Sequence, residues 1–428
     1  MLRVLLITRE PWRDDSNEGS VLSSWFNGQP MEFAQIYCKP GIPDSKCCKR
    51  FFQLTDKMAV KNLLRGEPMG AVVDLTAEAN ETKNTSEREK KSFYDFFRRH
   101  NWASFFLAQE FLWGLANWKS KALEEFVDDF APDVIFAPLC HSRYVMAIQR
   151  WASKRLNKPM AGIIWDDLYS FKQWHISPIY WLNRLLQRRS VKKTVDMCSR
   201  LYTLSPQQAE GFGELFHRSF DVLPKVGEMP ESQPPAVDSG IRFIYAGGVY
   251  FGRLKTLALV KDALAKLNQA GYPCQLDIYS NSPDVESLEE SGVCKVHTAV
   301  SAEELKSLYA RSHVALHVEG FSRSNEHHFQ LSFSSKIVDC LSSGCAVLAV
   351  CPSRNCGFRY LQASQAAVCV DQLEQLPAQL EMLVKDHEQR NLWAERAKSC
   401  LCANHTKEHV SALIHKQLSE LSCETVNE

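Results

Sequence analysis

A lysine near the start of a predicted helix is the first residue whose type and position could serve chemistry. The stretch from Phe329 to Pro352 is typical of a loop, a short helix and a buried strand, and Ser334 or Ser335 would cap the helix. Lys336 falls in the first helical turn, where the helix dipole disfavours a cation unless solvent or an anion is near. The free amides of this turn would complete a phosphate site. The alternative is a surface lysine on an amphipathic helix.

An acidic residue follows this lysine at helical spacing. Asp339 would lie on the same face about 5–6 Å further along, where its carboxylate could accept hydrogen bonds from sugar hydroxyls. A phosphate site beside such a carboxylate suits a nucleotide diphosphate sugar. The alternative is a solvated aspartate. Gly344 would end the helix, and the apolar run AVLAV after it predicts a parallel strand.

A glycine-rich turn after the predicted strand IRFIYA is a second candidate for phosphate binding. Gly247 and Gly248 would allow close approach of the backbone, and Arg253 could bind a phosphate with two hydrogen bonds. Lys255 is a further candidate beside it, and Glu319, after the strand HVALHVE, could contact a donor sugar. Such a turn alone indicates little, but it shares a predicted domain and sheet with the lysine helix.

Acidic residues and a histidine follow strands in the first half of the chain. Asp166 and Asp167 come directly after the strand MAGIIW, and His141 follows DVIFAP. Either carboxylate could act as a base or bind an acceptor hydroxyl, but an aspartate after a strand is also a common helix cap, and both interpretations stay open. Glu18 and Gly19 lie in the turn after the first strand, on the predicted acceptor side.

The elements that would position these residues alternate between strands and helices, which predicts parallel sheets covered on both faces. Among them, Asp56 would cap the helix that follows the strand FFQLT. A stretch rich in proline and acidic residues, GEMPESQPPAVDSG, divides two such halves. We predict a first Rossmann-like domain over 1–228, a linker over 229–240 and a second domain over 241–404. A C-terminal helix within 405–428 would return to the first domain. Doubly wound sheets bind ligands at the carboxyl ends of their strands, so we expect a cleft between the domains.

Composition narrows the class of protein. The 428 residues exceed one ordinary core, and 50 basic residues balance 50 acidic ones, which argues against binding nucleic acid. No apolar run approaches the roughly 18 residues of a membrane span. The fifteen cysteines are scattered without paired CxxC motifs, which is typical of reduced thiols in a cytoplasmic protein without a metal. The alternative is a metal site at Cys38, Cys47 and Cys48.

Two aromatic segments permit contact with a membrane. Residues 93–119 carry aromatic side chains every three or four positions, and residues 174–193 combine tryptophan, tyrosine and leucine with a basic end. The first pattern suits a buried helix, and the second suits a helix with one core-facing stripe and a solvated basic end. The alternative for both segments is a peripheral contact with a membrane. The second segment would then lie at an anionic bilayer surface and meet a lipid-linked acceptor.

The second half of the chain resembles glycosyltransferases of the GT-B fold, specifically the retaining group-1 family, also called glycosyltransferase family 4. YAGGVYFGRLKTLALVKDAL resembles its glycine-rich first loop, and SFSSKIVDCLSSGCAVLAVCP resembles its donor-site helix. A bacterial polysaccharide-assembly subgroup with a Ser-x-Ser-Thr-Lys-Ile sequence is most similar. Asp339 stands where the better-known form has its second glutamate, and Leu331 stands where that form has its first.

The resemblance implies a retaining transferase (EC 2.4) that moves a hexosyl group from a nucleotide diphosphate sugar to a glycan, lipid-linked or other hydroxyl acceptor. The donor would lie on the second domain, with Arg253 and Lys336 at its diphosphate and Asp339 at a sugar ring. No cofactor or metal is implied, and the protein would work in the cytoplasm or peripherally at the inner membrane face. The alternatives are a non-catalytic relative that acts as a scaffold or partner subunit, and a nucleotide-sugar epimerase.

Overall fold

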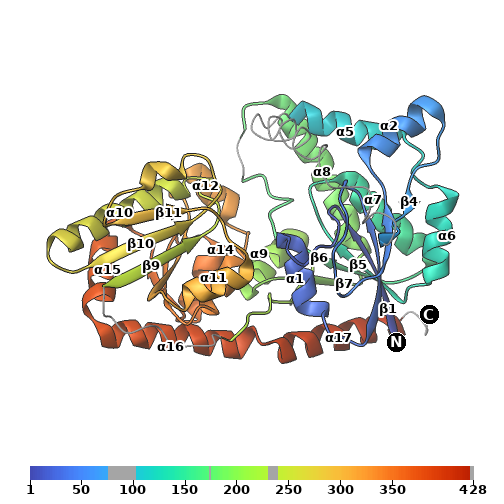
Figure 1. Cartoon of the computed structure of the whole chain (residues 1–428). Helices are drawn as coiled ribbons and strands as arrows, with labels where there is room; N and C mark the ends of the chain where they lie inside the picture. Colours follow the sequence, from blue (N-terminus) through green and yellow to red (C-terminus); the bar gives the residue numbers. More distant parts are fainter. Residues whose placement is uncertain (76–102, 173–174, 230–239, 425–428) are drawn as a thin grey trace.

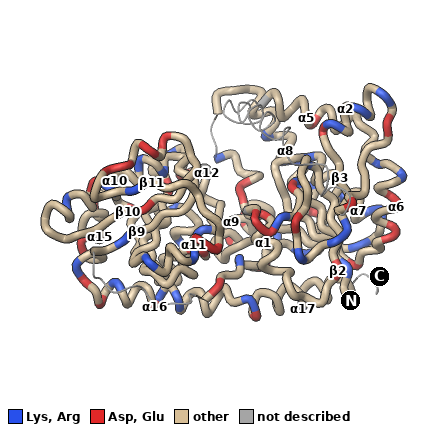
Figure 2. The backbone as a smooth tube through the Cα atoms, in the orientation of Figure 1, with Lys and Arg blue, Asp and Glu red and all other residues tan. Residues whose placement is uncertain are grey.

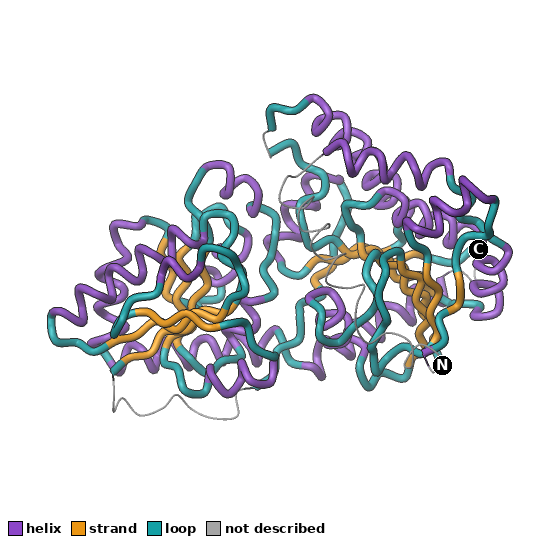
Figure 3. The backbone as a smooth tube through the Cα atoms, turned by 45° about the horizontal axis from the view of Figure 1, so that its top comes forward, coloured by secondary structure: helices purple, strands orange, loops and turns teal. Residues whose placement is uncertain are grey.

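Two parallel β-sheets, one from each half of the chain, organise the structure. The computed structural model describes residues 1–75, 103–172, 175–229 and 240–424. Each sheet is sandwiched between helices, and the two sheets lie in separate lobes (Figures 1 and 3). Both lobes are therefore α/β layers, as the alternating pattern predicts.

The first lobe contains an eight-stranded sheet in the order β4-β3-β2-β1-β5-β6-β7-β8, in which only the β3–β4 pair is antiparallel. Its strands are β1 (Leu2–Thr8), β2 (Met31–Tyr37), β3 (Arg50–Gln53), β4 (Ala71–Val72), β5 (Val134–Pro138), β6 (Met160–Ile163), β7 (Arg200–Thr203) and β8 (Asp221–Val222). The described helices of this lobe are α1 (Asn17–Phe26), α2 (Asp56–Arg65), α5 (Ala103–Leu115), α6 (Lys121–Phe130), α7 (Arg143–Leu156), α8 (Pro178–Met197) and α9 (Pro206–Phe216).

The second lobe contains a six-stranded, fully parallel sheet in the order β11-β10-β9-β12-β13-β14. Its strands are β9 (Ile241–Ala246), β10 (Cys274–Tyr279), β11 (Cys294–His297), β12 (Val314–Val318), β13 (Ala346–Val350) and β14 (Val368–Val370). Its α-helices are α10 (Arg253–Gln269), α11 (Ala302–Tyr309), α12 (Arg323–Phe329), α13 (Lys336–Leu341), α14 (Cys356–Ala363), α15 (Leu376–Lys385) and α16 (His387–Asn404), and α17 (Lys407–Glu424) follows them.

The strand order reverses at one point in each sheet, and these points place the candidate site. In the first sheet, β1 lies between β2 and β5, and in the second, β9 lies between β10 and β12. Loops that follow such strands diverge and leave a crevice at the carboxyl edge. The candidates Gly247 and Glu319 come directly after β9 and β12, while His141 follows β5. The predicted doubly wound topology is confirmed.

The two C-terminal helices lie along one side of both lobes (Figure 1). Helix α16 packs against β13 and α13 of the second lobe, whereas α17 packs against α1 of the first. The α17 residues Val410, Ile414 and Leu418 recur every four positions and are fully buried. The hydroxyl of Ser411 also donates to the carbonyl of Trp25 over 3.3 Å. The prediction that the last helix packs back on the first domain is confirmed.

His405 joins the two segments that cross between the lobes. Its Nδ1 donates to the carbonyl of Lys225 over 2.8 Å, and its own carbonyl accepts from the amide of Gly227 over 2.9 Å. The hydroxyl of Tyr360 lies 2.7 Å from Nε2. Burial, reinforced by the charge of Lys225 and opposed by the backbone hydrogen bond, lowers the pKa of His405. The neutral imidazole therefore fixes one crossing segment against the other.

Truncating Leu418 to alanine should lower the free energy of unfolding by about 2–5 kcal/mol, because it leaves a cavity between α17 and the first lobe. Chemical denaturation of the full chain measures this loss. Leu392 on α16 is exposed, so its replacement by alanine is the matched control and should change stability by no more than about 0.5 kcal/mol. Equal effects of the two substitutions would contradict the described packing of α17.

Some local predictions are wrong. Thr55, not Asp56, caps α2, because the Thr55 hydroxyl accepts from the amide of Met58 over 3.3 Å. Asp56 instead accepts from Gln109 over 2.8 Å and from Trp113 over 2.7 Å, and so ties α2 to α5. Of the aromatic segment 93–119, residues 93–102 lie outside the described part, and α5 buries only one of its faces. None of the described helices combines the length and the apolar character that crossing a bilayer would require.

Candidate active site

The glycine-rich turn and the lysine helix meet at the carboxyl edge of the second sheet. Gly247 directly follows β9 and has a φ of +141°, and a Cβ atom there would overlap the amino group of Lys336. The hydroxyl of Tyr245 donates to the carbonyl of Gly248 over 2.7 Å, which holds the turn in place. Lys336 Nζ also lies 5.6 Å from the centre of the Tyr245 ring. The absence of a side chain at Gly247 therefore makes room for the lysine.

Arg253 begins α10 and binds a buried carboxylate. Its Nε and Nη2 lie 2.9 and 2.8 Å from the two oxygens of Glu319, which is only 3% exposed. The bidentate grip expected for a phosphate is thus taken by Glu319, and Nη1 is the guanidinium nitrogen that no described residue binds. The hydroxyl of Thr256 donates to the Glu319 carbonyl over 2.8 Å. Lys255, the next candidate along α10, is exposed.

The centre of this site carries an excess of positive charge. Burial, and then repulsion by Arg253, lower the pKa of Lys336 to about 8. No carboxylate of the described residues forms an ion pair with Lys336. Burial and the same two cations lower the pKa of His317 to about 3, so this histidine on β12 is neutral. Two neighbouring cations, of which only Arg253 is paired with a carboxylate, favour an anionic ligand at this position.

Asp339 has a different partner from the one predicted. Lys225, in the segment that leaves the first lobe, donates through Nζ to Oδ1 of Asp339 over 2.5 Å. The carboxylate is partly exposed, with Oδ2 outside this contact, but its position beside the crossing segment ties α13 to the first lobe. A role in binding sugar hydroxyls stays a prediction.

The turn before α13 offers fewer free amides than expected. The amides of Ile337 and Val338 donate to the carbonyls of Ser334 and Ser335 over 3.1 and 3.2 Å. Ser335 occupies the N-cap position without a side-chain capping bond. Both serines are half-buried, and the two amides that donate within the turn are already engaged.

Leu331, at the position of the family's first glutamate, packs between the lobes. A Cβ atom at Gly211 on α9 would overlap the Leu331 side chain, which is buried in the core of the first lobe. The Gln208 side-chain amide donates to the carbonyls of Leu331 and Trp165, each over 2.9 Å. The apolar residue therefore contributes to the contact between the lobes, which a glutamate at this depth would disrupt.

Asp166 faces the second lobe. Its side chain is exposed, yet the surrounding protein desolvates the carboxyl enough to raise its pKa, and repulsion by Asp167 adds to this. A hydrogen bond with Ser332 partly opposes that shift. This hydrogen bond places Asp166 against the loop that leads into α13 of the second lobe. A carboxyl that solvent still reaches but that has a raised pKa is suited to exchanging protons.

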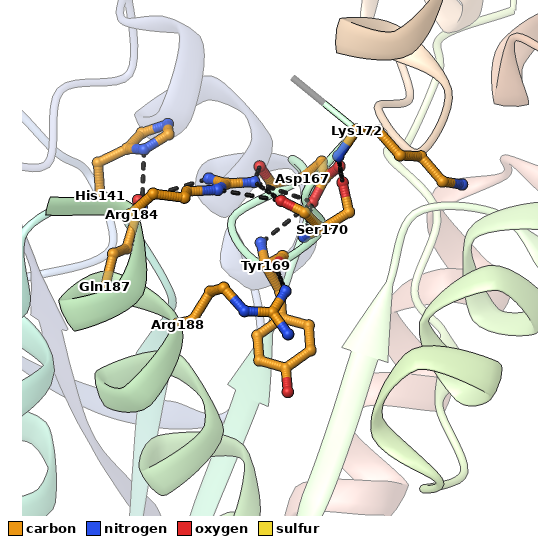
Figure 4. A network of polar contacts seen from close by, with 8 residues as sticks. All are labelled: His141, Asp167, Tyr169, Ser170, Lys172, Arg184, Gln187 and Arg188. Atoms are coloured by element: carbon orange, nitrogen blue, oxygen red, sulfur yellow. Dashed lines mark hydrogen bonds and ion pairs between the residues drawn. The ribbon is translucent and has the colours of Figure 1, made fainter. Parts of the chain in front are cut away.

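Asp167 serves the backbone instead. It accepts from the amides of Tyr169 and Ser170 over 3.0 and 2.7 Å and lies 3.5 Å from Nη2 of Arg184 on α8 (Figure 4). Arg184 also donates to the Ser170 carbonyl over 2.6 Å. The buried carboxylate thereby fixes the loop after β6, which favours the capping alternative over a base.

His141 and Glu18 complete the acceptor-side candidates. His141 is exposed, and its Nδ1 accepts from the Gln187 amide over 2.9 Å (Figure 4), so the neutral ring carries its proton on Nε2. Burial, and then repulsion by Glu10, raise the pKa of Glu18 to about 7. Gly19 is required because a Cβ atom would overlap the carbonyl of Arg13.

Sequence reasoning missed four residues that shape the site: Tyr245, His317, Ser332 and Lys225. Of these four, only Tyr245 could have been found from the sequence, because it lies just before the glycine turn that it contacts. The other three act through contacts between elements that are far apart in the sequence. Within the described ranges, no group of three or more histidine, cysteine, aspartate or glutamate side chains could hold a metal ion.

Known proteins share this architecture. Residues 257–416 match a family profile described as glycosyl transferase-like, whereas no curated protein matches the chain. The structure is similar to sucrose-phosphate synthase from Thermosynechococcus elongatus, with a TM-score of 0.59, 12% identity and coverage of 99% of this chain and 100% of the other. It is also similar to Anabaena HepE in complex with UDP and glucose, with a TM-score of 0.60, 11% identity and coverage of 98% and 100%. The chain has the GT-B fold.

A third GT-B structure agrees with this assignment. The α,α-trehalose-phosphate synthase (UDP-forming) from Burkholderia xenovorans, in complex with glucose-6-phosphate, gives a TM-score of 0.59 at 9% identity and coverage of 98% of this chain and 100% of the other. Lys336 and Arg253 lie in the second lobe of this fold, and Asp166 lies in the first.

Proposed function

We propose that this GT-B protein is a glycosyltransferase that moves a hexosyl group from a nucleotide diphosphate sugar to a hydroxyl acceptor with retention, as in glycosyltransferase family 4. The observation that carries the proposal is a pair of neighbouring cations at the carboxyl edge of the second sheet: Lys336 beside Gly247, which no described carboxylate pairs, and Arg253, which binds Glu319. The glycosyl transferase-like profile over residues 257–416 supports it. The complex of HepE with UDP and glucose supports a nucleotide sugar as the donor.

The donor diphosphate would bind between the glycine turn and α13. Lys336 would contact it through its ammonium group and Arg253 through Nη1, while Gly247 and Gly248 let the backbone come close. When the sugar–phosphate bond breaks, negative charge grows on the leaving diphosphate, and fixed cations there lower the barrier. Because these two residues supply the positive charge, the proposal requires no metal ion or other cofactor.

The acceptor would approach from the N-terminal domain. Asp166 would bind or deprotonate the attacking hydroxyl, since it is exposed and contacts Ser332 in the loop that leads to Lys336. Asp167 and Arg184 would position the loop that carries Asp166. Glu18 on α1 and His141 after β5 would bind further hydroxyls of a glycan or lipid-linked acceptor.

Asp166→Asn should lower kcat about 10²–10⁴-fold while the protein stays folded, because it removes the proton acceptor and leaves the loop intact. The measurement is release of nucleoside diphosphate from a panel of nucleotide sugars, with glycan and lipid-linked acceptors, followed by NMR of the anomeric centre. Asp167→Asn is the matched control and should lower stability instead. An active Asp166→Asn enzyme would contradict the role of Asp166 at the acceptor hydroxyl. A product with inverted anomeric configuration would contradict retention.

A non-catalytic scaffold is the second candidate, favoured by the packing role of Leu331 and by the ion pair of Asp339 with Lys225. Such a protein would bind a nucleotide without releasing diphosphate from any donor in the panel. An epimerase would convert the donor when no acceptor is present. The same assay therefore separates the three activities.

A further inference from the structure

Two helices of the N-terminal domain expose an apolar surface that the proposed transfer does not use. We define the α5–α8 surface by its large exposed apolar side chains: Phe106, Phe111 and Leu115 on α5, and Ile179, Leu182 and Leu185 on α8. Phe111 is 68% exposed and Leu182 is 52% exposed. A contiguous patch of this kind marks a site of interaction rather than scattered surface residues.

Contacts on their opposite faces hold both helices rigidly. Trp113 of α5 stacks on Tyr144 of α7, with ring centres 4.1 Å apart, and donates to Asp56 over 2.7 Å. On α8, Arg184 and Gln187 are buried in the network around Asp167 (Figure 4). The apolar faces are therefore presented outward by anchored helices.

A groove runs between the two helices. It encloses a volume of about 640 Å³ and is lined mainly by apolar residues, among them Leu107, Phe111 and Leu186. The two charged residues at its wall neutralise each other, because Arg143 Nε lies 3.4 Å from the carboxylate of Glu110. Such a groove suits a hydrocarbon chain rather than a polar ligand.

Basic residues border the surface on α8 and in the loop before it. The exposed face of α8 continues from Leu185 to Arg189 and Lys193 at helical spacing, and Lys172 is exposed in the preceding loop. None of these three cations forms an ion pair with a described residue. Helix α5 is mostly tan in Figure 2, and Arg143 already neutralises its single charged residue, Glu110. Apolar side chains beside unpaired cations complement an anionic lipid bilayer.

We propose that the α5–α8 surface docks on an anionic phospholipid bilayer, with its apolar side chains among the acyl chains and Lys172, Arg189 and Lys193 at the headgroups. Helix α8 also carries Arg184, which holds the loop of Asp166 and Asp167, so docking would set the acceptor loop at a fixed height above the lipid. If the proposed function holds, the acceptor is then a lipid-linked hydroxyl compound. Membrane docking itself does not depend on that function.

Flotation of the full-length protein with vesicles tests the proposal without any donor or acceptor. The wild type should float with vesicles of phosphatidylglycerol and phosphatidylcholine, and rising salt should weaken the binding. Arg189→Gln and Lys193→Gln should each weaken it about fivefold, as expected for loss of one cation near an anionic surface. Phe111→Glu combined with Leu182→Glu should abolish flotation, because both substitutions would bury a carboxylate in the lipid.

Matched controls lie on the other domain. Leu259→Glu on α10 and Leu392→Glu on α16 replace leucines that are 43% and 41% exposed, and these variants should float like the wild type. Circular dichroism and thermal unfolding would verify that all variants are folded.

Unchanged flotation of the Phe111→Glu, Leu182→Glu protein would overturn the proposal. A wild type that does not float with the vesicles would also overturn it. If that protein changes its oligomeric state when this surface is altered, the surface belongs to a protein partner instead. Failed flotation with intact sugar transfer to a soluble acceptor would refute docking and leave the proposed function standing.

Discussion

Lys336→Met is expected to lower kcat/KM at least about 10³-fold, in the range lost when a charged stabilising group is removed from an active site, while the unliganded protein stays as stable as the wild type or gains stability. The physical reason is that the lysine is held next to Arg253 without a carboxylate of its own, so its charge is unfavourable until an anion binds. Methionine keeps the volume beside Gly247 and removes the charge. Steady-state kinetics and chemical denaturation of the two proteins measure both effects.

The pH dependence of stability distinguishes this explanation from a general defect. The folded protein lowers the pKa of Lys336 from 10.5 to about 8. When folding lowers the pKa of a lysine, keeping that lysine charged destabilises the folded protein. The destabilisation is complete below the folded pKa and disappears as the pH rises to the unfolded pKa. The wild type should therefore gain up to about 3 kcal/mol relative to Lys336→Met between roughly pH 8 and pH 10.5.

Lys266→Met is the matched control for the lysine, because it changes an exposed lysine on the nearby α10. It should leave both the kinetics and the difference in stability with pH unchanged. A Lys336→Met protein that retains transfer within about tenfold would remove the lysine from the mechanism, since a charged group in direct contact with the leaving diphosphate contributes more than that.

Unlike Lys336→Met, Arg253→Met is expected to destabilise the protein and to lower its free energy of unfolding by about 3–5 kcal/mol. The substitution leaves the carboxylate of Glu319 buried without the two hydrogen bonds that now satisfy it. Thermal and chemical denaturation measure the loss. The two cations of one site thus serve different purposes, since Arg253 supports the fold as well as the ligand.

A double-mutant cycle tests the Arg253 result. Removing both charges with Arg253→Met and Glu319→Leu should recover most of the lost stability, because no unpaired charge remains buried. Glu319→Gln should cost less than Arg253→Met, at about 1–3 kcal/mol, because the amide can still accept one hydrogen bond. Additive losses in the double variant would show that the pair is not coupled as the distances indicate.

The fold was predictable from the sequence because its signals are local. The strand AVLAV, the alternation of elements and the C-terminal helix each follow from a few neighbouring residues, and the structure contains all three. Glycines before Arg253 and a lysine after two serines likewise predict an anion site from a few neighbouring residues, and that site stays a prediction. Strand β14, only three residues long, lacked a pattern long enough to recognise.

The partners of the site residues were not predictable, because they come from distant segments. Nothing near Asp339 indicates that Lys225 reaches it, and nothing near Leu331 shows that it packs on Gly211 of the other domain. The same holds for Arg253, whose pairing with Glu319 depends on the neighbouring strands β9 and β12. Residue types predicted a site, whereas the contacts that its residues make became visible only in the packing of the two domains.

Binding of nucleoside diphosphates to wild type and Lys336→Met tests the central claim most directly. Thermal unfolding would be followed with each nucleoside diphosphate in turn, without sugar or acceptor. A ligand at about 100 times its Kd should stabilise the wild type by roughly 2.7 kcal/mol. We predict such a shift with at least one nucleotide and its loss in Lys336→Met. No shift with any nucleotide, or an equal shift in both proteins, would contradict a diphosphate site at Gly247, Arg253 and Lys336.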